Sequence, residues 1–205
     1  MLEAIIFDIG NVLLAFDFGR AFQRIAPHCE GNILEQVTGL EPLKADLESG
    51  RIAAETFLEK AAAHLRYKGP RRELIEAWQQ IFEPIEATHQ LVNRLQGVVP
   101  LFLLSNTNSL HAEYFLSEWE VFSKFTGSVF SHEAGMMKPD QAIYEHTISS
   151  FGLNPARTLF VDDLEPNVAA GRVAGLQAHH YAASRHDALL SALRACGLPS
   201  EVWQR

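Results

Sequence analysis

The feature that most constrains the fold is a set of short apolar runs, each closed by polar residues. Four are nearly continuous and the fifth is more polar: Ala4–Asp8, Val98–Ser105, Ser128–Ser131, Thr158–Asp163 and Gln177–Ala182. Strands buried on both faces of a parallel sheet have such uninterrupted apolar sequences, whereas half-exposed strands alternate. The sequence therefore predicts a parallel sheet that is covered on both faces.

Helical patterns separate the later strands. The segments Glu86–Gln96 and Asp140–Phe151 each place their apolar residues on one helix face. Pro139 and Pro166 each stand where the first residue of a helix is expected, a position that tolerates proline. From about residue 91 onwards the chain alternates strand and helix. We therefore predict an α/β fold with a three-layer, parallel-sheet, Rossmann-like core.

The segment from residue 17 to residue 88 interrupts this pattern. It offers no good strand candidate, and Ala54–Arg66 and Arg72–Phe82 carry apolar stripes at helical spacing. We predict an inserted all-helical cap at residues 17–88 and a core formed by residues 1–16 and 89–205. Such a cap is either a lid over the edge of the sheet or a helical layer without a function of its own, and its length favours the lid.

Charge and cysteine content exclude several classes of protein. The formal net charge is -8, whereas proteins that bind nucleic acid or anionic membranes need a basic surface. Cys29 and Cys196 form neither a disulfide framework nor a CxxC metal site, which fits a reducing compartment. The N-terminus lacks the basic stretch of a signal peptide, and no apolar run approaches the roughly 20 residues of a membrane span. We expect a cytoplasmic protein, and nothing in the sequence distinguishes a monomer from a homodimer.

Polar side chains close the strands at the edge where open parallel sheets bind their ligands. Taken singly, each is explained as a helix cap, a turn residue or a solvated charge. Together they bring three carboxylates, a hydroxyl, an amide and an ammonium to one edge: Asp8, Asp162, Asp163, Ser105, Asn106 and Lys138. Crowded carboxylates repel each other unless a cation lies between them. The set therefore predicts a site for Mg²⁺, which prefers carboxylate and carbonyl oxygens together with water.

These residue types suit phosphoryl transfer. A carboxylate oxygen beside Mg²⁺ can attack phosphorus and form an aspartyl-phosphate. The transferred group needs positive charge and N–H donors around its oxygens, which Mg²⁺, Lys138, Ser105 and backbone amides can supply.

The same residues resemble the motifs of the haloacid dehalogenase-like (HAD) hydrolase superfamily. The matching stretches occur in the family's order between residues 5 and 167: FDIGNVL, LLSNTN, KP and VDDLEPN. The insertion resembles the type 1 helical cap of that family. In finer detail, four stretches resemble the branch that includes bacterial glucose-1-phosphate phosphatases: FDIGNVL, LSNTNSLH, KPDQAIY and DDLEPN.

The resemblance implies a set of metal ligands. Asp8 would be the nucleophile and a Mg²⁺ ligand, and Asp163 the second protein carboxylate on the metal. Asp162 would be a direct or water-mediated partner of the metal. Gly10 would contribute its backbone carbonyl to the metal and line the substrate site.

The resemblance also implies a phosphate site and a reaction. Ser105 and the backbone N–H of Asn106 would hold the phosphate, and Lys138 would neutralise the phosphate and Asp8. Asn167 would support the acidic loop. The implied function is Mg²⁺-dependent hydrolysis of a small phosphorylated metabolite, with a sugar phosphate as one candidate.

Gly10 departs from the family pattern, in which most phosphatases have a second Asp at this position. That Asp gives and takes the proton of the leaving group, which typically contributes ~10²–10⁴-fold in rate. We expect either a substrate with a good leaving group or another acid that reaches in. Asp17 is one candidate by position, although a helix cap explains it better. In the cap, Lys44, Glu48 and Arg51 flank a Ser-Gly pair that forms either a specificity loop or ordinary solvated helix ends.

Three other functions compete with this hypothesis. A protein of the same fold without turnover is supported by Gly10 alone. A metal-independent 2-haloacid dehalogenase shares the nucleophile, serine and lysine motifs, but Asp162 and Asp163 would repel its anionic substrate. A receiver-type phospho-acceptor domain uses similar residue types, but in a different order and without an insertion.

Overall fold

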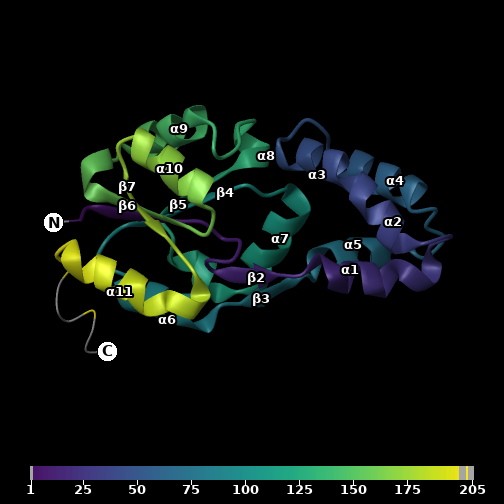
Figure 1. Ribbon diagram of the computed structural model, residues 1–205, viewed down its shortest axis with the longest axis horizontal. Coiled ribbons are helices and arrows are strands. Elements are labelled where there is room, and N and C mark those ends of the chain that lie inside the picture. Colours follow the sequence, from purple (N-terminus) through teal and green to yellow (C-terminus); the bar gives the residue numbers. More distant parts are fainter. Residues whose placement is uncertain (1, 199–201, 203–205) are drawn as a thin grey trace.

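The computed structural model describes residues 2–198 and residue 202, and its centre is a five-stranded parallel sheet (Figure 1). The spatial order of the strands is β5-β4-β1-β6-β7. Their bounds are Ala4–Phe7 (β1), Leu101–Ser105 (β4), Gly127–Phe130 (β5), Thr158–Asp162 (β6) and Gln177–His180 (β7). The predicted α/β class with a Rossmann-like parallel sheet is confirmed. All five strands lie within the segments expected from the apolar runs, to within one residue.

Burial explains why the apolar runs differ. Every residue of β1, β4 and β6 is buried, because these three strands have a neighbour on each side and helices on both faces. The strand β7 is at the edge of the sheet, and Gln177 and His180 are exposed there. Its polar character in the sequence reflects this edge position.

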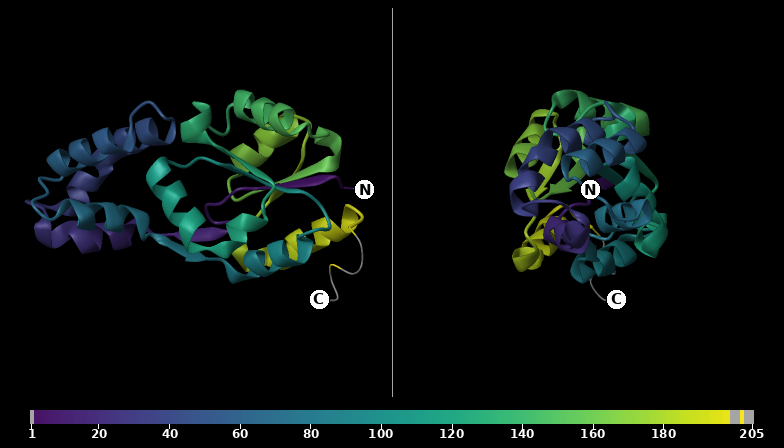
Figure 2. Two further views of the ribbon diagram at one scale, coloured as in Figure 1. Left: turned by 180° about the vertical axis from the view of Figure 1, so that it is seen from behind. Right: turned by 90° about the vertical axis from the view of Figure 1, so that its right-hand side faces the viewer.

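Helices cover both faces of the sheet (Figures 1 and 2). One face packs on apolar residues of α6 (Glu86–Leu95), α7 (Ser109–Glu118) and α11 (His186–Ala195). The other packs on α9 (Gln141–Phe151) and α10 (Glu165–Val173). A short helix, α8 (Ser131–Ala134), follows β5. These faces form the three layers expected of the core.

The helices between β2 and β3 pack around a separate hydrophobic cluster and extend from one end of the sheet (Figure 2). They are α1 (Phe18–Ile25), α2 (Ile33–Val37), α3 (Glu41–Glu48), α4 (Ala54–His64) and α5 (Arg71–Gln79). Short 3₁₀ turns occur in this part and in the core: Ala26–His28, Thr38–Leu40, Glu120–Lys124, Pro155–Arg157 and Ala183–Arg185. None of the described helices is both long and apolar enough to span a bilayer.

A two-stranded antiparallel ribbon connects the helical insertion to the core. The strand β2 (Leu14–Phe16) pairs with β3 (Phe82–Pro84), so that the chain leaves and re-enters the core side by side. The expectation of no strand between residues 17 and 88 is therefore wrong, because β3 lies inside that segment. A strand of three residues is too short to carry an alternating pattern, and this one is held by its pairing and by Phe82, which packs against both hydrophobic clusters.

The helix starts differ from the expectation at both prolines. Pro166 is the second residue of α10, which begins one residue earlier at Glu165. Pro139 precedes α9, because Asp140 is the N-cap and the helix begins at Gln141. The first helical position was therefore predicted two residues too early.

Candidate active site

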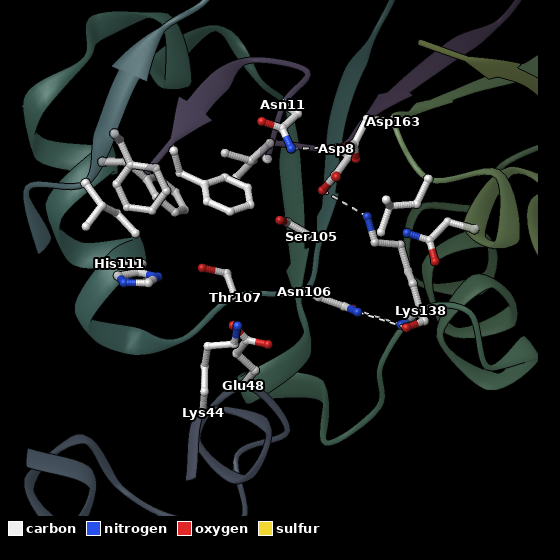
Figure 3. A pocket seen from close by; sticks show the side chains of 18 of the residues that line it. Asp8, Asn11, Lys44, Glu48, Ser105, Asn106, Thr107, His111, Lys138 and Asp163 are labelled. Atoms are coloured by element: carbon white, nitrogen blue, oxygen red, sulfur yellow. Dashed lines mark hydrogen bonds and ion pairs between the residues drawn. The ribbon is translucent and has the colours of Figure 1, made fainter. Parts of the chain in front are cut away.

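The polar ends of three adjacent strands meet below the insertion. Asp8 follows β1, Ser105 ends β4 and Asp162 ends β6, and β1 lies between the other two strands. Because the strands are parallel, all three residues lie at the same edge of the sheet. A pocket of about 280 Å³ opens there, between the sheet and the insertion (Figure 3). Its walls contain most of the residues singled out in the sequence: Asp8, Gly10, Ser105, Asn106, Lys138, Asp163 and Asn167.

Lys138 is the buried cation of this pocket. Its Nζ lies 2.9 Å from Oδ1 of Asp8 and 2.7 Å from Oδ2 of Asp162, and it donates a hydrogen bond of 2.9 Å to the carbonyl of Leu104. All three ammonium donors thus have an acceptor. Burial alone would lower the pKa of Lys138, but the two carboxylates outweigh it and raise the pKa above its ordinary value. Lys138 therefore stays charged.

The side chain of Asn106 holds the Lys138 backbone in place. Its Nδ2 donates to the Lys138 carbonyl at 2.8 Å, and its Oδ1 accepts from the Lys138 N–H at 2.8 Å. This pair of bonds joins the loop after β4 to the loop before α9. The sequence analysis assigned a role only to the backbone N–H of Asn106. The hydrogen bonds of its side chain to the Lys138 backbone are not indicated by any motif.

Three carboxylates converge beside Lys138. Asp8, Asp162 and Asp163 each place an oxygen within 4.8 Å of the others. Asp162 is fully buried, and its oxygens accept hydrogen bonds from Lys138, the N–H of Leu164 and the amide of Asn167. The oxygens of Asp162 are thus engaged by protein donors, whereas Asp8 and Asp163 face the pocket.

The charge of this cluster suits a divalent cation. Burial raises the pKa of Asp8 against the opposing effect of Lys138, and burial likewise raises the pKa of Asp163. Within the cluster, one ammonium faces three carboxylates, which leaves an excess of negative charge. Hard carboxylate oxygens at this spacing are the donor set that Mg²⁺ prefers.

Asn11 is a site residue that the sequence reasoning missed. Its Nδ2 donates to Oδ2 of Asp163 at 3.0 Å, which joins the loop after β1 to the loop after β6. Its φ angle is 53°, in the left-handed region that Asn tolerates better than most residues. The only signal in the sequence was an Asn directly after Gly10.

Gly10 has no side chain to offer the pocket, and a phenyl ring lies beside it. A Cβ atom at this position would be 3.1 Å from the Phe16 ring. Asp17 does not replace the missing acid: its carboxylate accepts the Gly19 N–H at 2.8 Å as the N-cap of α1. It does not line the pocket, so the helix-cap interpretation of Asp17 is confirmed.

The insertion and α7 supply an aromatic wall and two charged residues. Phe16, Phe18 and Phe82 line the pocket, and α3 contributes Lys44 and Glu48. His111 of α7 is also in the wall, but the carbonyl of Trp78 and the amide of Asn108 occupy its two ring nitrogens. Burial lowers the pKa of His111 to about 3, so the ring is neutral.

The chain is similar in sequence to known proteins over most of their length. The D-ribitol-5-phosphate phosphatase of Bacteroides thetaiotaomicron is 24% identical over 189 residues, which are 86% of this chain and 90% of that protein. The sesquiterpene phosphatase AstK of Aspergillus oryzae is 25% identical over 187 residues, 87% of this chain and 89% of that protein.

A solved structure and a family model extend the comparison over the fold. The HAD family enzyme BT-2542 of Bacteroides thetaiotaomicron, in complex with magnesium and inorganic phosphate, has a TM-score of 0.80 at 23% identity. The match covers 90% of this chain and 96% of that one. The model of the haloacid dehalogenase-like hydrolases matches residues 2–175, a range that includes every motif residue named above. The chain belongs to the haloacid dehalogenase-like hydrolase family.

Proposed function

We propose that this protein is a Mg²⁺-dependent phosphomonoester hydrolase that works through an aspartyl-phosphate on Asp8. The observation that carries the proposal is the buried Lys138 ammonium beside three carboxylates in the pocket at the edge of the sheet. Two relatives with phosphatase names, each matched over most of its length, support the same reaction class.

The residues of the site fit the metal. Asp8 and Asp163 would hold Mg²⁺ with the carbonyl of Gly10, and the ion would supply positive charge against the phosphate oxygens. Asp162 has its oxygens engaged by Lys138, Leu164 and Asn167. We therefore assign Asp162 to holding Lys138 in place, with any contact to the metal made through water.

The protein's own groups carry out the two displacement steps. An oxygen of Asp8 attacks phosphorus as the bond to the leaving oxygen breaks, and water later cleaves the aspartyl-phosphate. Lys138 keeps Asp8 ionised and neutralises the phosphoryl oxygens. The Ser105 hydroxyl and the Asn106 N–H hold those oxygens in line.

The size of the pocket sets the substrate class. A volume of about 280 Å³ is at the lower end of ligand pockets, which suits a small phosphorylated metabolite. Phe16, Phe18 and Phe82 offer apolar faces to the carbon skeleton of the leaving group. A sugar phosphate, which has one apolar ring face, is one candidate of this class.

The test is phosphate release from p-nitrophenyl phosphate and a panel of sugar phosphates, with Mg²⁺ and with EDTA. We expect Mg²⁺-dependent turnover, lost at least about 10³-fold in Asp8→Asn because the nucleophile is removed. Asp187→Asn is the matched control, since Asp187 is exposed on α11 in the core, outside the pocket. Turnover that survives in Asp8→Asn contradicts the mechanism.

Two further measurements, of phosphate binding and of chloride release, would select the competing functions. Phosphate binding without any release would favour a protein without turnover, the reading that Gly10 supports. Chloride release from 2-chloropropionate without Mg²⁺ would favour a dehalogenase, although the carboxylates beside Lys138 disfavour an anionic substrate without a cation.

A further inference from the structure

The pocket contains few groups that could move a proton in place of the acid absent at Gly10. Asp8, Asp163 and Lys138 belong to the nucleophile and metal cluster. The other titratable residues in the pocket wall are His111, Lys44 and Glu48. His111 is neutral with both ring nitrogens hydrogen-bonded. Lys44 lies 3.0 Å from the Glu41 carboxylate and 4.9 Å from the Phe18 ring centroid.

Glu48 is the remaining acid, and its carboxylate is available. It is partly buried at the end of α3 and, among residues 2–198 and 202, no hydrogen bond or ion pair engages its side chain. Figure 3 shows Glu48 and Lys44 entering the pocket from the insertion, across from Asp8 and Lys138. A substrate phosphate on Asp8 would thus place its leaving group toward Glu48.

Backbone contacts hold Glu48 against the core. The Ser131 hydroxyl donates to the Glu48 carbonyl at 2.5 Å and accepts the Thr107 N–H at 2.9 Å. Thr107 directly follows Asn106, so the Ser131 hydroxyl connects the end of α3 to the loop after β4. Gly50 has a φ of 70° and packs so closely on the His132 carbonyl that a Cβ would collide with it. The position of Glu48 is therefore set by the core rather than by α3 alone.

The surroundings of Glu48 allow both protonation states near neutral pH. The pKa of Glu48 is raised to about 7, and burial is the main cause. The charge of Lys44 opposes this shift and the charge of Glu41 adds to it. The neighbouring helices α8 and α4 carry the other titratable groups on elements packed against α3: His132, Glu133, Glu55, Glu59, Lys60 and His64. A carboxyl group balanced in this way can give a proton in one step and take one in the next.

We propose that Glu48 is the general acid and base of this enzyme, supplied by the insertion in place of the side chain that Gly10 lacks. The inference rests on the proposed phosphatase function. In the first step the Asp8–phosphorus bond forms, the bond to the leaving oxygen breaks, and the Glu48 proton passes to that oxygen. In the second step the Glu48 carboxylate takes a proton from water as water attacks phosphorus and Asp8 leaves.

The test compares Glu48→Gln with the wild-type protein on phenyl phosphate and p-nitrophenyl phosphate. The two substrates are close in size, but only the phenolate of the first needs protonation to leave readily. We expect kcat/KM, which reports the first step only, to fall about 10²-fold or more on phenyl phosphate and less than about 10-fold on p-nitrophenyl phosphate. Glu59→Gln makes the same chemical change at an exposed site on α4 and should match the wild type on both.

Inhibition by inorganic phosphate shows whether the Glu48→Gln site is intact, and it should be unchanged. An equal loss of kcat/KM on both substrates would overturn the proposal, since it would assign Glu48 to binding or to structure. Unchanged kinetics on both would overturn it as well. A wild-type protein without Mg²⁺-dependent turnover on either substrate would instead contradict the proposed function itself.

Discussion

Among single residues, Lys138 and Glu48 show two opposite ways of burying a charge. Lys138 is surrounded by the carboxylates of Asp8 and Asp162 and by a backbone carbonyl, which keep its ammonium charged. Glu48 has only the charge of Lys44 to offset its burial, and its pKa rises to about 7. One charge is thus permanent, and the other changes within the physiological pH range.

The free energy of unfolding should depend on pH because the pKa of Glu48 is raised in the folded state. Its folded pKa is about 7 and its ordinary value is 4.5, so the folded state binds more protons between these values and stability falls as pH rises through them. Glu48→Gln removes this loss. Denaturant titrations should find the variant more stable than the wild type at pH 8, by up to about 3 kcal/mol. The difference should vanish below about pH 4.5, and a difference independent of pH would contradict the shift.

The sequence predicted most residues of the sheet edge but not what their side chains contact. Asp8, Ser105 and Asp163 could be found because each closes an apolar run, and parallel strands end at one edge. The Asn106 side chain and Asn11 could not, since each contacts a loop distant in sequence. Glu48 is in the pocket because α3 packs on α8, a tertiary contact without a sequence pattern.

At the scale of elements, the contact between α3 and α8 decides how the insertion meets the core. Ser131, the first residue of α8, holds the last residue of α3 through one hydroxyl. Gly50 makes the close approach of the two helices possible, because a side chain there would meet the His132 carbonyl. The contact between α3 and α8 thus depends on the hydroxyl of Ser131 and on the lack of a side chain at Gly50.

Gly50→Ala should lower the activity of the enzyme, whereas alanine at another left-handed glycine should not. The new Cβ collides with the His132 carbonyl and moves Glu48, and a misplacement of about 1 Å can reduce rate about 10²-fold. Gly97→Ala is the matched control, because Gly97 has a φ of 76° but open space around its Cβ position. Both variants should lose about 1 kcal/mol of unfolding free energy to the left-handed backbone, and Gly50→Ala should lose more because of the collision. Only Gly50→Ala should lower kcat/KM. Equal kinetics in the two variants would contradict a role for the contact.

The elements themselves were predictable where burial is uniform. The inner strands β1, β4 and β6 are buried throughout, which an apolar run reports directly. The ribbon β2–β3 has residues that range from buried to exposed within three positions, so neither strand has a period to detect. The start of α9 was misplaced because Pro139 fits the first position of a helix as well as the residue before its cap.

For the molecule as a whole, the proposed cation site at the sheet edge predicts that stability depends on Mg²⁺. Asp8 and Asp163 come from loops after different strands, β1 and β6, and the Asn11–Asp163 hydrogen bond already joins those loops. An ion held by both would tie the two halves of the sheet together. Its binding to the folded state alone would add to the free energy of unfolding.

Mg²⁺ should therefore raise the Tm of the wild-type protein. At about 100 times its Kd, the ion adds about 2.7 kcal/mol, which corresponds to roughly 5–10 °C for a chain of this size. Asp163→Asn should lose most of this shift, and Asp187→Asn should keep it, because Asp187 is exposed outside the pocket. Thermal unfolding with and without EDTA measures the shift. The same shift in wild type and Asp163→Asn would place the ion elsewhere.

The ribbon that joins the insertion to the core has a consequence for how such chains diversify. Leu14 and Pro84 are paired neighbours, so the whole stretch between them departs and returns at one point. Its replacement by a segment of another length leaves the connectivity of the parallel sheet unchanged, and with it Asp8, Ser105, Lys138 and Asp163. Under the proposed mechanism, the proton donor Glu48 can then be exchanged together with the insertion, while the residues proposed for phosphoryl transfer stay with the core.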